Sequence, residues 1–151
     1  MSAPAVSGLH HLKVPVSDLE VTLDWYQRVF GAVRRPEFDH FDREGRFFAA
    51  IVDVPGVDTM LELRLAPRMA RDLRGFDPII FSARTHADLL DWQAHLDGIG
   101  IRNSGIIYGI IGWTLIWHDP DGLSVRVYSE EEHAPDMEGA DINNPWLRYP
   151  D

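Results

Sequence analysis

The chain contains an internal repeat with an offset of 67 residues. Five positions match at this offset: Leu23-Asp24-Trp25 with Leu90-Asp91-Trp92, Gly8 with Gly75, and Gly31 with Gly98. Tryptophan is rare, so its presence inside the matched tripeptide argues against chance. Self-similarity at a fixed offset indicates duplication of one supersecondary unit. The 151 residues are therefore best interpreted as one domain built twice.

Both halves predict the same order of elements, which is strand, helix and three strands. In the first half the capping-box pattern Ser17-Asp18-Leu19-Glu20 opens the helix and Gly31 ends it. The first half predicts a strand at 9–16, a helix at 18–30, and strands at 33–41, 46–53 and 59–65. The second half predicts a strand at 76–83, a helix from Thr85–Asp88 to near Gly98, and strands at 101–111, 113–118 and 123–128.

This repeated order predicts an α+β fold of two paired βαβββ modules. One such unit leaves an open sheet edge and half of a concave face, so two units together would form a curved, partly open mixed sheet around a cup. We expect an N-terminal extension at 1–7, a single domain at 8–129, and a tail at 130–151. Within the domain the modules are 8–66 and 75–129, joined by a polar, Arg-rich linker at 67–74.

Composition excludes several classes of function. The chain has no cysteine, which rules out disulfides, thiol nucleophiles and cysteine-held metals. Its formal net charge of −10 opposes binding to nucleic acid. The absence of a long apolar run argues against a membrane span, and the first residues lack the pattern of a secretory signal. We therefore expect a cytoplasmic protein with a small-molecule ligand and with neither nucleic acid nor membrane as partner.

Five motifs of the chain resemble those of the vicinal oxygen chelate superfamily. This superfamily includes glyoxalases, extradiol dioxygenases, bleomycin- and fosfomycin-resistance proteins and methylmalonyl-CoA epimerases. The matching stretches are Leu9–Glu20, Trp25–Gly31, Leu61-Glu62-Leu63, Gly75–Phe81 and His118-Asp119-Pro120-Asp121-Gly122. The resemblance covers about residues 8–129 and implies the fold of paired modules, but function on such a scaffold must be argued from the site.

The resemblance also assigns four metal-ligand positions, and two of them are unsuitable here. They fall on His11, Glu62, Pro78 and Arg126. Proline has no side-chain donor atom, and arginine stays protonated. We therefore expect no cofactor. The alternative is a divalent iron, zinc, nickel or manganese ion held by His11 and Glu62 with a shifted ligand set, in which His10 could take the place of His11.

The charged and titratable residues at these positions support two interpretations of the site. If the modules pair as in the family, His11, Glu62 and Arg126 converge and are the candidate catalytic residues. Either Arg126 forms an ion pair with Glu62, or Arg126 binds a ligand oxygen while His11 or Glu62 moves a proton. Lys13, the only lysine, shares a strand face with His11. It either lines the cup or extends its ammonium group to water.

Aromatic residues on the predicted strands are candidates for the walls of a ligand site. They are Phe48, Tyr108, Trp113 and Trp117. The alternative is that they belong to the core.

Three functions remain open on the sequence. The first is a metal-independent protein that binds an organic, anionic or aromatic ligand, either for sequestration or for acid–base chemistry as a lyase or isomerase. The second is a metal-dependent glyoxalase- or dioxygenase-type enzyme, and the third is a non-catalytic ligand sensor. The resemblance further implies a homodimer, and the aromatic stretch 143–150 could pack on a partner chain.

Overall fold

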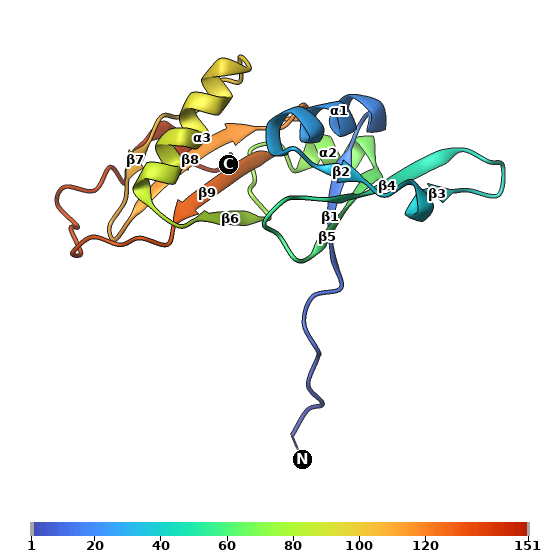
Figure 1. Cartoon of the computed structure of the whole chain (residues 1–151), viewed down its shortest axis with the longest axis horizontal. Helices are drawn as coiled ribbons and strands as arrows, with labels where there is room; N and C mark the ends of the chain where they lie inside the picture. The colour runs from blue at the N-terminus through green and yellow to red at the C-terminus, as the bar shows by residue number, and fades with distance from the viewer. Residues whose placement is uncertain (1, 151) are drawn as a thin grey trace. The chain divides into compact units, whose positions relative to one another are not determined.

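A computed structural model describes residues 2–150, which form two compact units, unit 1 up to Ala70 and unit 2 from Arg71 onward (Figure 1). Each unit contains one open β-sheet and one long helix. The α+β class and the open mixed sheets predicted from the sequence are thereby confirmed.

Unit 1 contains the first strand–helix repeat. Its main elements are β1 (His11–Val16), α1 (Leu19–Phe30), β2 (Val33–Arg34), β3 (His40–Phe41), β4 (Phe47–Asp53) and β5 (Met60–Leu65). The sheet order is β1-β5-β4-β2, and β3 pairs with β4. Strand β1 is parallel to β5, which sets Lys13 opposite Glu62. The first and last strands of the module are therefore neighbours.

Unit 2 repeats this topology. Its main elements are β6 (Ile80–Ala83), α3 (His86–Gly98), β7 (Ile107–Tyr108), β8 (Trp113–His118) and β9 (Ser124–Ser129). The order is β6-β9-β8-β7, with β6 parallel to β9 and Ile80 opposite Arg126. Helix α1 begins at Leu19 and α3 at His86, the same 67-residue offset that the sequence repeat shows.

The helix ends follow local chemistry. Gly31 adopts the left-handed conformation, with φ of 65°, that ends α1 as predicted. The N-cap of α1 is Asp18, which accepts from the Val21 amide, so the expected capping role of Ser17 is wrong. At α3, Thr85 and Asp88 form a complete capping box.

Several predicted strands are shorter than expected. The strand at 33–41 is interrupted by a 3₁₀ turn, η1 (Pro36–Phe38), because proline cannot donate to the strand ladder. In the stretch 76–83, pairing begins only at Ile80, after Pro78. Of 101–111, only β7 is a strand, with one isolated bridge from Asn103 to Trp117.

Two segments expected to be irregular contain short helices. The predicted linker holds α2 (Pro67–Asp72), and the tail holds a 3₁₀ turn, η2 (Pro145–Leu147). Earlier in the tail, the backbone amides of His133, Asp136 and Asp141 donate to the carbonyls of Ile111, Ile110 and Tyr108. This part of the tail therefore pairs with the chain around β7, the edge strand of the second sheet.

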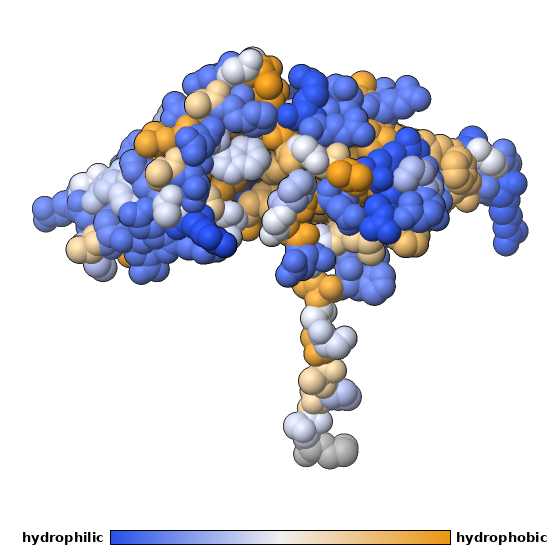
Figure 2. All heavy atoms as spheres, viewed as in Figure 1, coloured by the Kyte–Doolittle hydropathy of each residue, from blue (hydrophilic) through white to orange (hydrophobic). Residues whose placement is uncertain are grey.

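Each sheet packs one face against its own helix. In unit 1 the buried side chains of Val14, Leu61 and Leu63 alternate with polar ones along β1 and β5, and α1 contacts β4 and β5. In unit 2, α3 lies against β8 and β9 (Figure 1), and Trp92 stacks on the fully buried Trp117. Hydrophilic side chains cover most of the face seen in Figure 2.

Among residues 2–150, no helix combines the length and the apolar character that a membrane span requires.

The turn between β8 and β9 generates a prediction about stability. Burial raises the pKa of Asp119 to about 6. Its Oδ1 accepts from the amides of Asp121 and Leu123, while Oδ2 is buried without a hydrogen-bond partner. Because the folded pKa lies above the unfolded value, ionisation of this group lowers stability as pH rises through the interval from about 4 to 6.

Asp119→Asn keeps the acceptor and removes the buried charge. We expect it to raise the free energy of unfolding by about 1–2 kcal/mol at pH 7.5 and to change it little at pH 4. Urea unfolding at both pH values measures this. A substitution effect that does not vary with pH would contradict the account.

Candidate functional site

In unit 1, Glu62 is a buried carboxylate surrounded by side chains that can carry positive charge. Its side chain is 2% exposed, and Oε2 lies 3.0 Å from Nζ of Lys13. Nε of Arg64 lies 3.7 Å from Oε1. The parallel pairing of β1 with β5 produces this contact, since Lys13 and Glu62 are directly opposed. The ammonium group of Lys13 contacts Glu62, and the Lys13 side chain as a whole stays half-exposed.

Two histidines complete this cluster. Nε2 of His11 is 3.9 Å from Glu62 Oε2, and Nε2 of His40 is 3.6 Å from Oε1. The predicted wall residue Phe48 lies beneath the Arg64 guanidinium, 4.7 Å from ring centre to carbon, and edge-on to His40. We call His11, Lys13, His40, Glu62 and Arg64 the Glu62 cluster. It combines one buried negative charge with partly exposed cationic and imidazole groups.

In unit 2, Arg126 is paired with Asp77. Nε of Arg126 lies 2.7 Å from Asp77 Oδ2, with side-chain exposures of 13% and 1%. The hydroxyl of Tyr149 donates to Asp77 Oδ1 at 2.7 Å. This hydrogen bond to the carboxylate raises the pKa of Tyr149. Arg126 therefore has a buried counterion inside its own unit.

The repeat relates these two clusters. At the 67-residue offset, His10 corresponds to Asp77, His11 to Pro78 and Lys13 to Ile80. Glu62 and Arg126 are equivalent because they pair with Lys13 and Ile80 in the same parallel register. In unit 1 the last strand, β5, carries the carboxylate Glu62 and the first strand, β1, carries Lys13. In unit 2 the last strand, β9, carries the cation Arg126, and the carboxylate Asp77 lies just before the first strand, β6.

The residues at the four family positions do not fit a metal site of the usual kind. Pro78 offers no donor, Arg126 is an ion-paired guanidinium, and Glu62 already lies beside Lys13 and Arg64. A catalytic metal requires three or four protein ligands. Among residues 2–150 no group of three or more His, Asp or Glu side chains is placed to hold a metal ion.

The other three predicted wall residues, Tyr108, Trp113 and Trp117, lie in unit 2. Trp117 is a core residue on the face covered by α3. Tyr108 stacks on His133, with ring centres 4.3 Å apart, and its hydroxyl donates to Asp136. Trp113 stacks on His86. The structure therefore gathers Tyr108 and Trp113 with the tail and with the start of α3, apart from Arg126.

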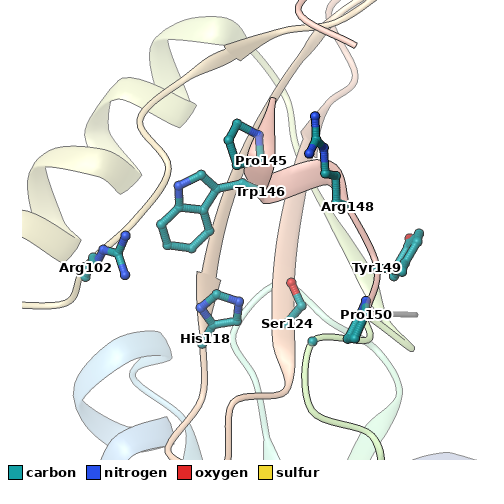
Figure 3. A pocket seen from close by; sticks show the side chains of 9 residues that line it. Arg102, His118, Ser124, Pro145, Trp146, Arg148, Tyr149 and Pro150 are labelled. Carbon is teal, nitrogen blue, oxygen red and sulfur yellow. The ribbon is translucent and has the colours of Figure 1, made fainter. Parts of the chain in front are cut away.

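Sequence reasoning missed several residues of these clusters. His40, Arg64 and Asp77 were not singled out, although the period-two alternation of β5 places Arg64 on the face of Glu62. The offset of 67 would have matched Asp77 to His10. His118, which directly precedes the turn between β8 and β9, was not recognised either, and it lines a pocket together with the tail (Figure 3).

Comparison with known proteins gives the family. The model of the Glyoxalase/Bleomycin resistance protein/Dioxygenase superfamily matches residues 8–127. The chain belongs to this superfamily, so the resemblance noted from its motifs is confirmed. Comparison with the curated proteins gave no match.

Solved structures similar to the chain include both binding proteins and enzymes. The antibiotic-binding protein TnmS3 from Streptomyces sp. CB03234 is 26% identical, with a TM-score of 0.67 over 89% of this chain and 100% of that one. Lactoylglutathione lyase from Agrobacterium tumefaciens is 17% identical, with a TM-score of 0.62 over 84% and 96%. The Mn(II)- and sulfate-bound fosfomycin resistance protein FosX from Listeria monocytogenes is 16% identical, with a TM-score of 0.62 over 89% and 97%. The latter two likenesses concern the fold alone.

The contact between Lys13 and Glu62 predicts a measurable coupling. Lys13→Met leaves the buried carboxylate without its nearest cation, whereas the double variant Lys13→Met/Glu62→Gln removes both charges. The free energies of unfolding of the parent, Lys13→Met, Glu62→Gln and the double variant form a double-mutant cycle. We expect this cycle to give a coupling free energy of about 1–2 kcal/mol between the two side chains.

The exposed pair of Arg28 and Asp24 on α1 provides the matched control for this cycle. Its coupling should stay below about 0.5 kcal/mol. A Lys13–Glu62 coupling no larger than this control would contradict the assignment.

Proposed function

We propose that this protein binds a small organic molecule without a metal ion and sequesters it unchanged. The observation that carries the proposal concerns Glu62 and Arg126, the two residues at family positions that have charged partners close by. Glu62 lies 3.0 Å from Lys13, and Arg126 lies 2.7 Å from Asp77. Each charge is balanced within its own unit, so neither depends on a metal ion.

Similarity to TnmS3 supports a binding role. That protein is described as antibiotic-binding, and its full length is covered at 26% identity. The partly exposed heads of His11 and Lys13, with Arg64 above Phe48, offer polar and aromatic contacts in unit 1. With the modules paired as in the family, Arg126 would complete a cup from the other module. That pairing, within a chain or between two chains of a homodimer, is part of the proposal.

A second candidate is metal-independent acid–base chemistry, and the placement of His11 favours it. The imidazole is 36% exposed and lies 3.9 Å from the buried Glu62 carboxylate. A carboxylate near imidazole stabilises the imidazolium ion that forms when the ring accepts a proton. His11 would then be the base, and Glu62 its positioning residue.

Ligand recovery separates these two functions. The purified protein is incubated with a set of antibiotics that includes bleomycin and fosfomycin, and complexes are detected by native mass spectrometry. We expect at least one compound to be retained and released on denaturation at its original mass, with or without EDTA. Lys13→Met should weaken retention, while Arg28→Gln, the matched control on α1, should not.

A released compound of changed mass would contradict sequestration and favour the second candidate. A change that EDTA abolishes would contradict both metal-independent functions. Failure of the whole set to bind would count against the proposal as well.

Restoring the family ligands provides an independent prediction. The double variant Pro78→His/Arg126→Glu supplies the two metal-ligand side chains of the family pattern that the chain lacks, in addition to His11 and Glu62. We expect it to gain affinity for Mn²⁺ or Zn²⁺ by at least about tenfold over the parent in calorimetric titration. The single variant Arg126→Glu, with three of the four donors, should gain less.

No gain in the double variant would contradict the assignment of positions 78 and 126.

A further inference from the structure

A pocket of about 420 Å³ lies within unit 2, between the sheet and the tail (Figure 3). Strands β8 and β9 contribute His118 and Ser124, which are directly opposed in the ladder. The tail contributes Pro145, Trp146 and 148–150, and Gly75 and Arg102 complete the lining. The volume falls in the range of roughly 300–1,000 Å³ that is usual for small-molecule sites.

The tail wall of this pocket is held in place by specific contacts. Tyr149 donates to the buried Asp77, which also pairs with Arg126. Asn144 caps the turn η2 by accepting from the Trp146 amide. Gly75 has φ of 84°, and a Cβ there would come within 2.8 Å of Pro150. The glycine thus leaves room for the tail, and the wall is part of the fold of unit 2.

The lining of the pocket is positively charged in an otherwise acidic chain. Among residues 2–150 the lining contains Arg102 and Arg148 and no carboxylate, although the chain carries a net charge of −10. Within residues 2–150 neither arginine forms an ion pair. The Asp77 carboxylate is already shared by Arg126 and Tyr149. Among the described residues, no carboxylate neutralises the two arginines of the pocket.

A flat aromatic surface accompanies this charge. The Trp146 indole stacks on His118, with ring centres 5.0 Å apart and planes 18° apart. The Arg102 guanidinium lies 5.2 Å from the centre of the same indole. Partial burial and the nearby charges of Arg102 and Arg74 lower the pKa of His118. The lowered pKa favours the neutral form of the ring, so the arginines are the cationic groups of the pocket.

We propose that this pocket is a second binding site, in unit 2 alone, for a small aromatic carboxylate. A guanidinium matches the geometry of a carboxylate, and the stacked rings of Trp146 and His118 offer an apolar, aromatic contact to a ligand ring. The site needs no pairing of the modules, so the proposal goes beyond the sequestration function and does not rest on it.

Titration with 2-naphthoate tests the proposal, and the neutral 2-naphthamide serves as the matched ligand. We expect the full-length protein to bind naphthoate saturably in calorimetry and to bind the amide at least about tenfold more weakly. Arg102→Gln should weaken naphthoate binding by a similar factor, and Trp146→Leu should also weaken it. Arg84→Gln changes the net charge equally at an exposed residue outside the pocket and should leave the affinity unchanged.

Three results would overturn the proposal: no saturable binding of naphthoate, equal affinity for acid and amide, or an Arg102→Gln effect no larger than that of Arg84→Gln. Circular dichroism of each variant checks that its fold is retained. The residues varied here lie outside the Glu62 cluster, so failure of this test leaves the sequestration proposal standing.

Discussion

The parallel pairing of the first and last strands of each module is the constraint on which the rest depends. It brings residues about fifty positions apart into direct opposition, Lys13 with Glu62 in unit 1 and Ile80 with Arg126 in unit 2. The helix between them covers the opposite face of the sheet, so the uncovered face can hold polar groups. Duplication reproduces this arrangement, and any chemistry must then come from a few substitutions at equivalent positions.

The two modules carry opposite charges at one equivalent position, Glu62 in unit 1 and Arg126 in unit 2. A carboxylate removed from water requires a counterion or hydrogen-bond donors, because isolated burial of a charge costs several kcal/mol. Glu62 meets this requirement with Lys13 and Arg64, and Asp77 meets it with Arg126 and Tyr149. In metal-dependent relatives a divalent ion would supply the positive charge. In the function that we propose for this chain, side chains supply it, Lys13 and Arg64 in unit 1 and Arg126 in unit 2.

Local signals made much of the fold predictable. The 67-residue offset, the Gly31 helix end and the Thr85 capping box each depend on a few neighbouring residues. The superfamily motifs predicted His11 and Glu62, and the structure brings these two side chains together. The shortening of the predicted strand at 33–41 also has a local cause, Pro36, which the period of apolar residues did not reveal.

What sequence reasoning missed arises from long-range contacts. The partnership of Arg126 with Asp77 and Tyr149 joins a strand, a loop and the tail, and no short-range pattern specifies it. The contacts of Trp146 with His118 and of Tyr149 with Asp77 likewise join the tail to distant parts of unit 2. Trp117 and Phe48 look alike as strand aromatics. Only the assignment of sheet faces separates the core residue from the one beside Arg64.

Metal content is the most direct test of the central claim that side-chain cations replace the metal ion. The protein is expressed in medium supplemented with iron, zinc, nickel and manganese, dialysed without chelator, and measured by inductively coupled plasma mass spectrometry. The account predicts less than about 0.1 equivalent of any of these metals per chain, because an open catalytic site needs at least three protein ligands. Retention of close to one equivalent of a single metal would contradict it.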